Sequence, residues 1–126
     1  MEKILIAMYH YVRPIKKSNF TFIKGLEVED FISQINYLQK NYEIIGMDIL
    51  INFIKNKVPL PKKSCLLTFD DGYKDHYLYV YPELKKRGLL GSFFPVGSTI
   101  LENKILDVNK IHFILAKGTK LNFIID

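Results

Sequence analysis

The sequence predicts an α/β fold in which parallel strands are covered by helices. Apolar, strand-like runs alternate along the chain with segments whose apolar residues recur at helical spacing. Three runs, KILIAM, SCLLTF and LLGSFF, are apolar almost throughout, which is typical of strands buried on both faces of a parallel sheet. No repeat or linker interrupts this pattern, so we predict a single domain over residues 1–126.

The elements follow from local signals taken in chain order. The expected strands are short apolar runs at residues 3–8, 42–45, 64–69, 89–94 and 121–125. The expected helices cover residues 27–40, 47–57, 75–87 and a last segment that Asp107 caps and Gly118 ends. That last helix is expected to use Val108, Ile111, Ile114 and Leu115 as its apolar face.

Composition excludes several classes of protein. The net charge is +5, from 18 basic and 13 acidic residues, but only Arg13 and Arg87 are arginines. Scattered lysines predict a soluble surface rather than a nucleic-acid interface. No stretch is long enough to span a membrane, and no signal peptide is recognised, so we expect a cytoplasmic protein. Cys65 is a lone cysteine in an apolar run and is expected to be buried.

The strongest chemical signal is the segment Asp70-Asp71-Gly72 at the end of an expected strand. Two adjacent carboxylates repel each other, and a turn at Gly72 lets both face one cleft. A divalent cation would relieve the repulsion and take one carboxylate as a ligand. The other carboxylate would then be free to accept a proton from water. The alternative is an ordinary turn, because Asp and Gly are common turn residues.

His10 follows the first expected strand, and the carboxyl ends of parallel strands form the functional rim of such folds. That rim would collect His10, the acidic pair and the loop beginning at Pro95. A neutral imidazole there could be a metal ligand or an acid–base group. The alternative is a histidine that orders a loop by hydrogen bonding.

The remaining histidines and a group of tyrosines are weaker candidates. His76 begins a helix and is expected at its surface, although it could face the cleft. His112 lies among apolar residues and is expected to be a hydrogen-bonded core residue rather than a ligand. Four tyrosines follow the acidic pair and could line a sugar site, although half-buried helix packing is favoured: Tyr73, Tyr77, Tyr79 and Tyr81.

The segment Leu66-Leu67-Thr68-Phe69-Asp70-Asp71-Gly72 resembles the first motif of the polysaccharide deacetylase family, which includes chitin and peptidoglycan deacetylases. Three further segments resemble family features, namely residues 8–10, 82–88 and 91–97. The resemblance runs from Lys3 to Gly97. Residues 106–118 resemble a subgroup found among bacterial genes for surface-glycan and sugar modification.

The resemblance implies a distorted (β/α) barrel of seven strands. It implies removal of N- or O-acetyl groups from a sugar or polysaccharide with a divalent metal, usually zinc. Asp70 would be the general base, and Asp71 would be a metal ligand, with His10 and His112 as candidate further ligands. Tyr73 and Pro95 would contact the carbohydrate substrate.

The chain also departs from the family pattern. The second family motif, His-Ser/Thr-x-x-His, is absent, and His112 is the histidine nearest its expected place. Five strands cannot close a seven-stranded barrel. We therefore expect either the N-terminal part of a longer protein or a truncated product whose exposed edge another chain, such as a second copy, covers. The 126 residues by themselves are expected to have little activity. The alternative function is a non-catalytic remnant that binds a glycan or a partner.

Overall fold

The computed structural model describes residues 3–117. A four-stranded parallel sheet forms the centre, with β3 (Ser64–Asp70) as the strand to which the others pair. β1 (Ile4–Tyr9) runs along one side of β3. On the other side, β2 (Glu43–Ile45) pairs with the first half of β3, and β4 (Ser92–Phe94) pairs with the second half. The predicted α/β architecture with parallel strands is confirmed.

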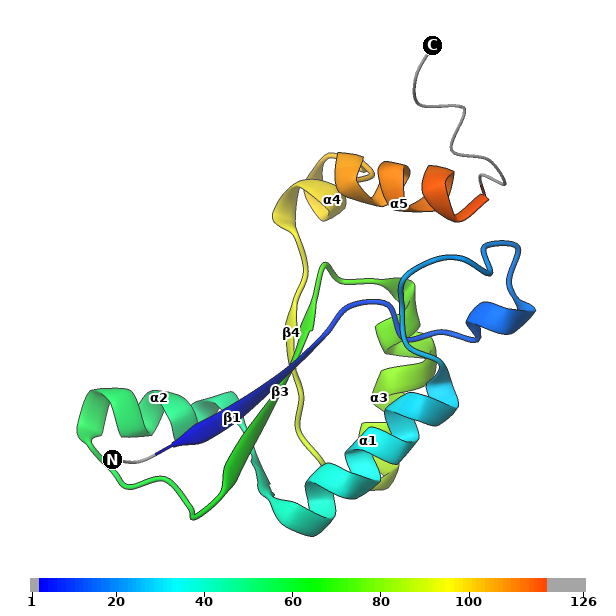
Figure 1. The fold of residues 1–126 in the computed structure, drawn as a ribbon. Helices are drawn as coiled ribbons and strands as arrows, with labels where there is room; N and C mark the ends of the chain where they lie inside the picture. Colours follow the sequence, from blue (N-terminus) through cyan, green and yellow to red (C-terminus); the bar gives the residue numbers. More distant parts are fainter. Residues whose placement is uncertain (1–2, 118–126) are drawn as a thin grey trace.

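The helices lie in three places (Figure 1). α1 (Val28–Asn41) and α3 (Tyr81–Lys86) cover the same face of the sheet, with the π-helical turn η2 (His76–Val80) leading into α3. α2 (Met47–Asn56) lies apart from them. α4 (Gly97–Leu101) and α5 (Asp107–Lys117) lie beyond the carboxyl end of the sheet, and a short 3₁₀ helix, η1 (Ile15–Lys17), lies in the loop after β1.

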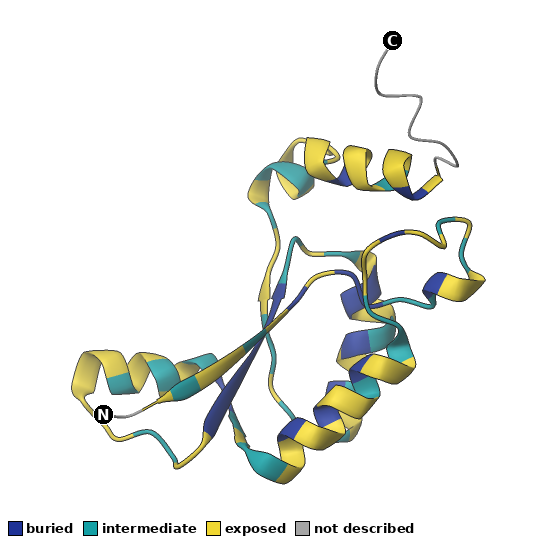
Figure 2. Ribbon diagram, in the orientation of Figure 1, coloured by how far each residue is buried: buried dark blue, intermediate teal, exposed yellow. Residues whose placement is uncertain are grey.

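The main core fills the space between the sheet and the two helices α1 and α3. Cys65, Leu67 and Phe69 alternate along β3 and point toward α1, where Phe31 and Ile35 meet them. All five are fully buried. Figure 2 shows β3 in dark blue over nearly its whole length, whereas α2 is largely yellow. β3 is therefore the most deeply buried strand of the sheet.

We call the opposite side the open face of the sheet. The register pairs Met8 of β1 with Thr68 of β3 and Phe94 of β4 with Asp70, so these side chains lie on that face. Met8 is 60% exposed and Phe94 is 48% exposed. The continuous apolar pattern of residues 3–8 predicts a strand buried on both faces, and this prediction is wrong for β1.

Several boundaries differ from the predictions. The expected helix 75–87 begins as a π-helical turn, and the strand expected at 89–94 is formed only by Ser92–Phe94. The expected loop after Pro95 becomes α4 at Gly97, and the 3₁₀ helix at Ile15–Lys17 was not predicted. The expected strand at 121–125 lies outside the described residues. The four strands of residues 3–117 form an open sheet and not a closed seven-stranded barrel.

Candidate active site

The acidic pair occupies a tight turn at the carboxyl end of β3. Asp70 is the last residue of the strand, and the next two residues have left-handed backbone conformations, with φ of 70° at Asp71 and 66° at Gly72. Aspartate tolerates this region better than most residues, and glycine adopts it freely. The turn folds Tyr73 back toward the strand, and its hydroxyl donates a 2.6 Å hydrogen bond to Oδ2 of Asp71.

The turn also requires glycine because of its neighbour. A Cβ atom at Gly72 would lie 2.8 Å from Cβ of Pro95. We therefore expect Gly72→Ala to destabilise the fold more than Gly88→Ala, which has the same φ but no atom within 4 Å of the added Cβ. Gly88→Ala should cost about 1–2 kcal/mol for the left-handed backbone alone. Gly72→Ala should cost about 1–3 kcal/mol more because of the contact. Urea unfolding measures both, and equal costs would contradict the close approach of Pro95.

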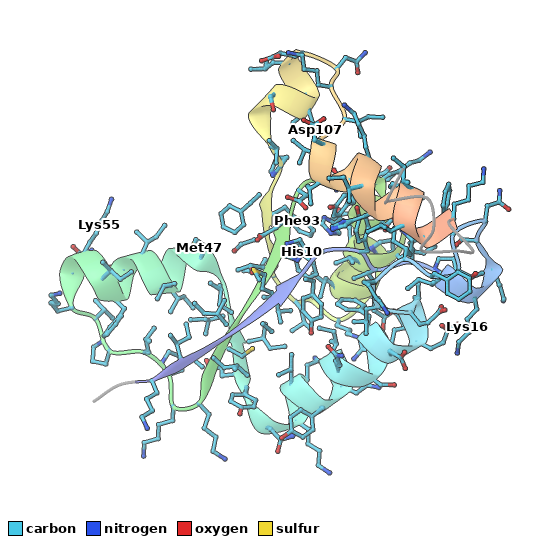
Figure 3. The ribbon with its side chains drawn as sticks, turned by 45° about the horizontal axis from the view of Figure 1, so that its top comes forward. His10, Lys16, Met47, Lys55, Phe93 and Asp107 are labelled. Atoms are coloured by element: carbon cyan, nitrogen blue, oxygen red, sulfur yellow. The ribbon has the colours of Figure 1, made fainter. Side chains whose placement is uncertain are left out.

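His10 lies beside Asp70 along the rim of the sheet. The register pairs Met8 with Thr68 and Tyr9 with Phe69, so one further step brings His10 level with Asp70. His10 is exposed where β1 leaves the sheet (Figure 3). Asp70 is half-buried, and Phe94 is its partner on the other side. The register therefore brings His10 and Asp70 to the same rim of the sheet, and their roles in a site stay a prediction.

His76 is buried next to this rim and binds the backbone of His10. Its Nε2–H donates a 2.7 Å hydrogen bond to the backbone carbonyl of His10, and only 4% of the residue is exposed. The predicted surface position is wrong, because η2 directs the ring inward against Phe69 and Tyr73. Nδ1 of His76 is buried and has no hydrogen-bond partner among the residues described. Burial lowers the pKa of His76, so the ring is neutral with its proton on Nε2.

This histidine should make stability depend on pH. Above the ordinary imidazole pKa of 6.5, His76 is neutral in both the folded and the unfolded chain. Below pH 6.5, the unfolded chain binds a proton at His76 that the folded chain does not. The free energy of unfolding therefore decreases as the pH is lowered, until the pH reaches the lowered pKa of His76 in the folded chain. Chemical unfolding across a pH series should show a shallower loss for His76→Gln than for wild type. Parallel curves for the two proteins would contradict a neutral buried His76.

A second polar group connects the turn to α5. The side-chain amide of Asn109 donates to the hydroxyl of Tyr73 at 2.7 Å and to that of Tyr11 at 2.8 Å. The Tyr11 hydroxyl also lies 3.3 Å from Nδ1 of His112. The rings of Tyr11 and Tyr73 stack with their centroids 4.2 Å apart. His112 is hydrogen-bonded, as predicted. It is exposed, however, and is therefore not a core residue.

An ion pair fixes the loop after β1 against η2. Nε of Arg13 donates to Oδ2 of buried Asp75 at 2.5 Å. The same guanidinium lies over the rings of Tyr11, at 4.9 Å from the centroid, and Phe113, at 5.5 Å. Arg13 therefore joins the first loop, η2 and α5 around the acidic turn.

The described residues do not complete a metal centre. Within residues 3–117, no group of three or more His, Cys, Asp or Glu side chains is arranged to hold a metal ion. Zinc sites in proteins use three or four protein ligands. The predicted set of Asp71, His10 and His112 does not form such a site within these residues.

Comparison with known proteins identifies the family. A family model described as Polysaccharide deacetylase matches residues 57–118. The YxkH protein of Bacillus subtilis (strain 168), named as a polysaccharide deacetylase, is 33% identical over 100 residues, covering 78% of this chain and 33% of that protein. The chain belongs to the polysaccharide deacetylase family. The resemblance predicted from the sequence is confirmed.

Other deacetylases extend the comparison. The poly-beta-1,6-N-acetyl-D-glucosamine N-deacetylase of Escherichia coli (strain K12) is 34% identical over 68 residues, covering 53% of this chain and 10% of that protein. The de-N-acetylase structure from Aggregatibacter actinomycetemcomitans matches with a TM-score of 0.67 and 29% identity, over 81% of this chain and 40% of that chain. IcaB from Ammonifex degensii matches with a TM-score of 0.65 and 27% identity, over 76% and 39%. The chain spans about a third of the length of YxkH.

A cavity of about 270 Å³ borders the acidic turn of this deacetylase-family chain. Its walls include the two residues predicted to contact substrate, Tyr73 and Pro95, together with Tyr77, Tyr81 and Phe93. Tyr77 is 73% exposed, so its ring is available at the surface rather than packed as the helix prediction favours. A larger hollow of about 890 Å³ lies at the opposite end of the sheet and has no acidic or histidine side chain in its lining. The smaller cavity is the substrate candidate that adjoins the acidic turn, because Gly72 and Tyr73 line it.

Sequence reasoning missed two residues of this site. Asn109 is buried in α5, and Tyr11 is buried in the loop after β1. Neither lies in a recognisable motif, and their shared hydrogen bond joins positions that are 98 residues apart.

Within residues 3–117, no helix is long and apolar enough to cross a membrane.

Proposed function

We propose that the chain acts in hydrolysis of acetyl groups on a sugar or polysaccharide. The observation that carries the proposal is the turn formed by Asp70, Asp71 and Gly72, held at the sheet rim in a chain of the polysaccharide deacetylase family. In the N-acetyl case, water adds to the acetyl carbonyl, the C–N bond breaks, and acetate and a free sugar amine are formed. The name of the Escherichia coli relative favours β-1,6-linked N-acetylglucosamine in a surface glycan as the first substrate to test.

Each residue of the turn has a separate role in this proposal. Asp70 accepts the proton of the attacking water, because it lies half-buried on the open face with His10 level beside it. Asp71 is held by Tyr73 and supplies the second carboxylate. Tyr73 and Pro95 contact the sugar from the wall of the adjoining cavity, where aromatic faces suit the apolar face of a sugar ring.

We propose that a divalent cation, zinc first, assists this chemistry as the family generally requires. Asp71 would be one ligand, with His10 and His112 as candidates for others. The described residues do not complete a ligand set with them. Zinc bound per chain, measured for wild type and for Asp71→Ala, tests the ligand. Equal binding by the two proteins would remove Asp71 from the proposed site.

The proposed function is tested by measuring binding and product together. Acetylated β-1,6-linked glucosamine oligomers should bind the chain and release acetate and free amine in equal amounts, at the low rate expected of these 126 residues by themselves. Acetate without new amine would indicate removal of O-acetyl groups instead. Failure to bind and to release acetate would contradict any role for the turn in carbohydrate chemistry.

A second candidate function is glycan binding without catalysis. It is favoured by the lack of a complete metal-binding group within residues 3–117. It predicts that the same oligomers bind but that no acetate appears, with or without added zinc. The two candidates therefore differ in one measured product.

We also propose that a second copy of the chain covers the open edge of the sheet at β1. Met8 and Ile6 are 60% and 53% exposed there, and burying such side chains stabilises association. The mass measured by light scattering should rise with concentration for wild type, and Met8→Lys should shift it to the monomer. Tyr37→Lys, at an exposed position of α1 on the opposite face of the sheet, is the matched control and should not. A wild-type monomer at every concentration would contradict this proposal.

A further inference from the structure

The way in which α5 packs is unusual for an amphipathic helix. Its large apolar side chains remain in contact with solvent, because Ile111 is 54% exposed and Ile114 is 69% exposed. The predicted apolar face is therefore wrong. The residues that α5 buries are Asn109, 7% exposed, and Ala116, 3% exposed. A polar side chain thus occupies the centre of the contact between α5 and the rest of the fold.

Burying an amide is costly unless its hydrogen bonds are made. The Nδ2 group of Asn109 has two N–H bonds, and two tyrosine oxygens lie at 2.7 and 2.8 Å from it. The polar part of the contact is therefore satisfied by two particular partners, while Ala116 and Phe113 supply its apolar part. This makes the placement of α5 depend on Tyr73 and Tyr11.

The direction of each hydrogen bond follows from the protons available. The Tyr73 hydroxyl has one proton, which it donates to Oδ2 of Asp71, since a carboxylate can only accept. The oxygen of Tyr73 must then accept from Asn109, which requires the amide nitrogen to face it. A continuous chain of donors therefore runs from Asn109 through Tyr73 to Asp71.

We infer that Asn109 is a positioning residue for the acidic turn: by donating to Tyr73, it holds the Tyr73 hydroxyl where it fixes the carboxylate of Asp71. α5 is then the element that sets the orientation of Asp71, although it follows the turn by more than thirty residues. The bond from Asn109 to Tyr11 has a different function, since it docks α5 on the loop after β1 without reaching Asp71. The consequence for catalysis rests on the proposed function, whereas the orientation of Asp71 does not.

Three variants separate these two bonds. Asn109→Ala removes both, Tyr73→Phe removes only the path to Asp71, and Tyr11→Phe removes only the docking bond. The readout is the set of three-bond couplings from the Asp71 side-chain carbon to its backbone nitrogen and carbonyl, which report the χ1 rotamer in solution. Dispersed amide spectra show that each variant is folded.

We expect a single Asp71 rotamer in wild type and in Tyr11→Phe. We expect rotamer-averaged couplings in Tyr73→Phe and in Asn109→Ala, and the double variant Tyr73→Phe/Asn109→Ala should differ little from either single one. Unchanged couplings in Asn109→Ala or in Tyr73→Phe would overturn the inference. Averaging in Tyr11→Phe equal to that in Asn109→Ala would also overturn it, because Asn109 would then act only by docking α5.

Acetate release by the same variants provides a separate readout. Asn109→Ala and Tyr73→Phe should lower kcat by similar factors, and Tyr11→Phe should lower it less. If wild type releases no acetate, the proposed function fails, but the couplings still decide whether Asn109 positions Asp71. The two failures are therefore distinguishable.

Discussion

Asp70→Asn should lower the rate of acetate release by about 10²–10⁴-fold, because positioned general bases contribute a factor of that size. Asparagine has nearly the same shape as aspartate but cannot accept a proton from water. Asp70 ends β3, and the buried strand behind it should hold the substituted side chain in place. Kinetic assay with acetylated oligomers should therefore show a fall in kcat with little change in KM.

A matched control separates loss of the base from loss of negative charge. Asp30→Asn removes a carboxylate from the exposed first turn of α1 and should leave the rate nearly unchanged. The thermal midpoint of Asp70→Asn should stay close to that of wild type. If Asp70→Asn and Asp30→Asn had equal rates, Asp70 would not be the base.

Phe69→Ala should destabilise the fold by about 3–5 kcal/mol, the cost of truncating a buried aromatic ring in a core. Phe69 is fully buried and stacks on Tyr9 and Phe93, with centroids 5.3 and 4.8 Å away. Gly91 lies so close that a Cβ atom there would be 2.7 Å from the Phe69 ring. The surroundings are held by backbone on this side, so they should collapse little into the cavity.

Urea unfolding of Phe69→Ala and Phe22→Ala measures this effect against a control. Phe22 is 68% exposed in the loop after β1, so its truncation should change stability by less than about 0.5 kcal/mol. Because Phe69 directly precedes Asp70, its removal should also loosen the acidic turn. A cost below about 1 kcal/mol for Phe69→Ala, where 3–5 is typical, would contradict the core described here.

The fold could be predicted where a local pattern is enough to specify it. SCLLTF is continuously apolar, and β3 is buried along its length, Cys65 included. KILIAM has the same pattern, yet Met8 is exposed, because burial depends on what else covers the open face. Similarly, helical periodicity located α5 but not the face that it would bury. A pattern identifies an element, whereas its partners come from the whole chain.

The candidate site was likewise predictable only where neighbouring residues specify the structure. The turn at Asp70-Asp71-Gly72 was predicted, since glycine and aspartate have a local reason to adopt left-handed backbone there. The burial of His76 was not predicted, because it depends on a hydrogen bond to His10, which lies 66 residues away. The role of Asn109 was equally hidden, because it contacts the turn only after α5 has packed on it.

The most direct test of the central claim is acetate release in water enriched in ¹⁸O. The claim is that water, activated at Asp70, attacks an acetyl group bound beside the turn. Wild type should release acetate carrying one ¹⁸O per molecule together with one new amine, and Asp70→Asn should form this labelled product far more slowly. Labelled acetate formed equally fast by Asp70→Asn, or no labelled acetate from wild type, would contradict the account.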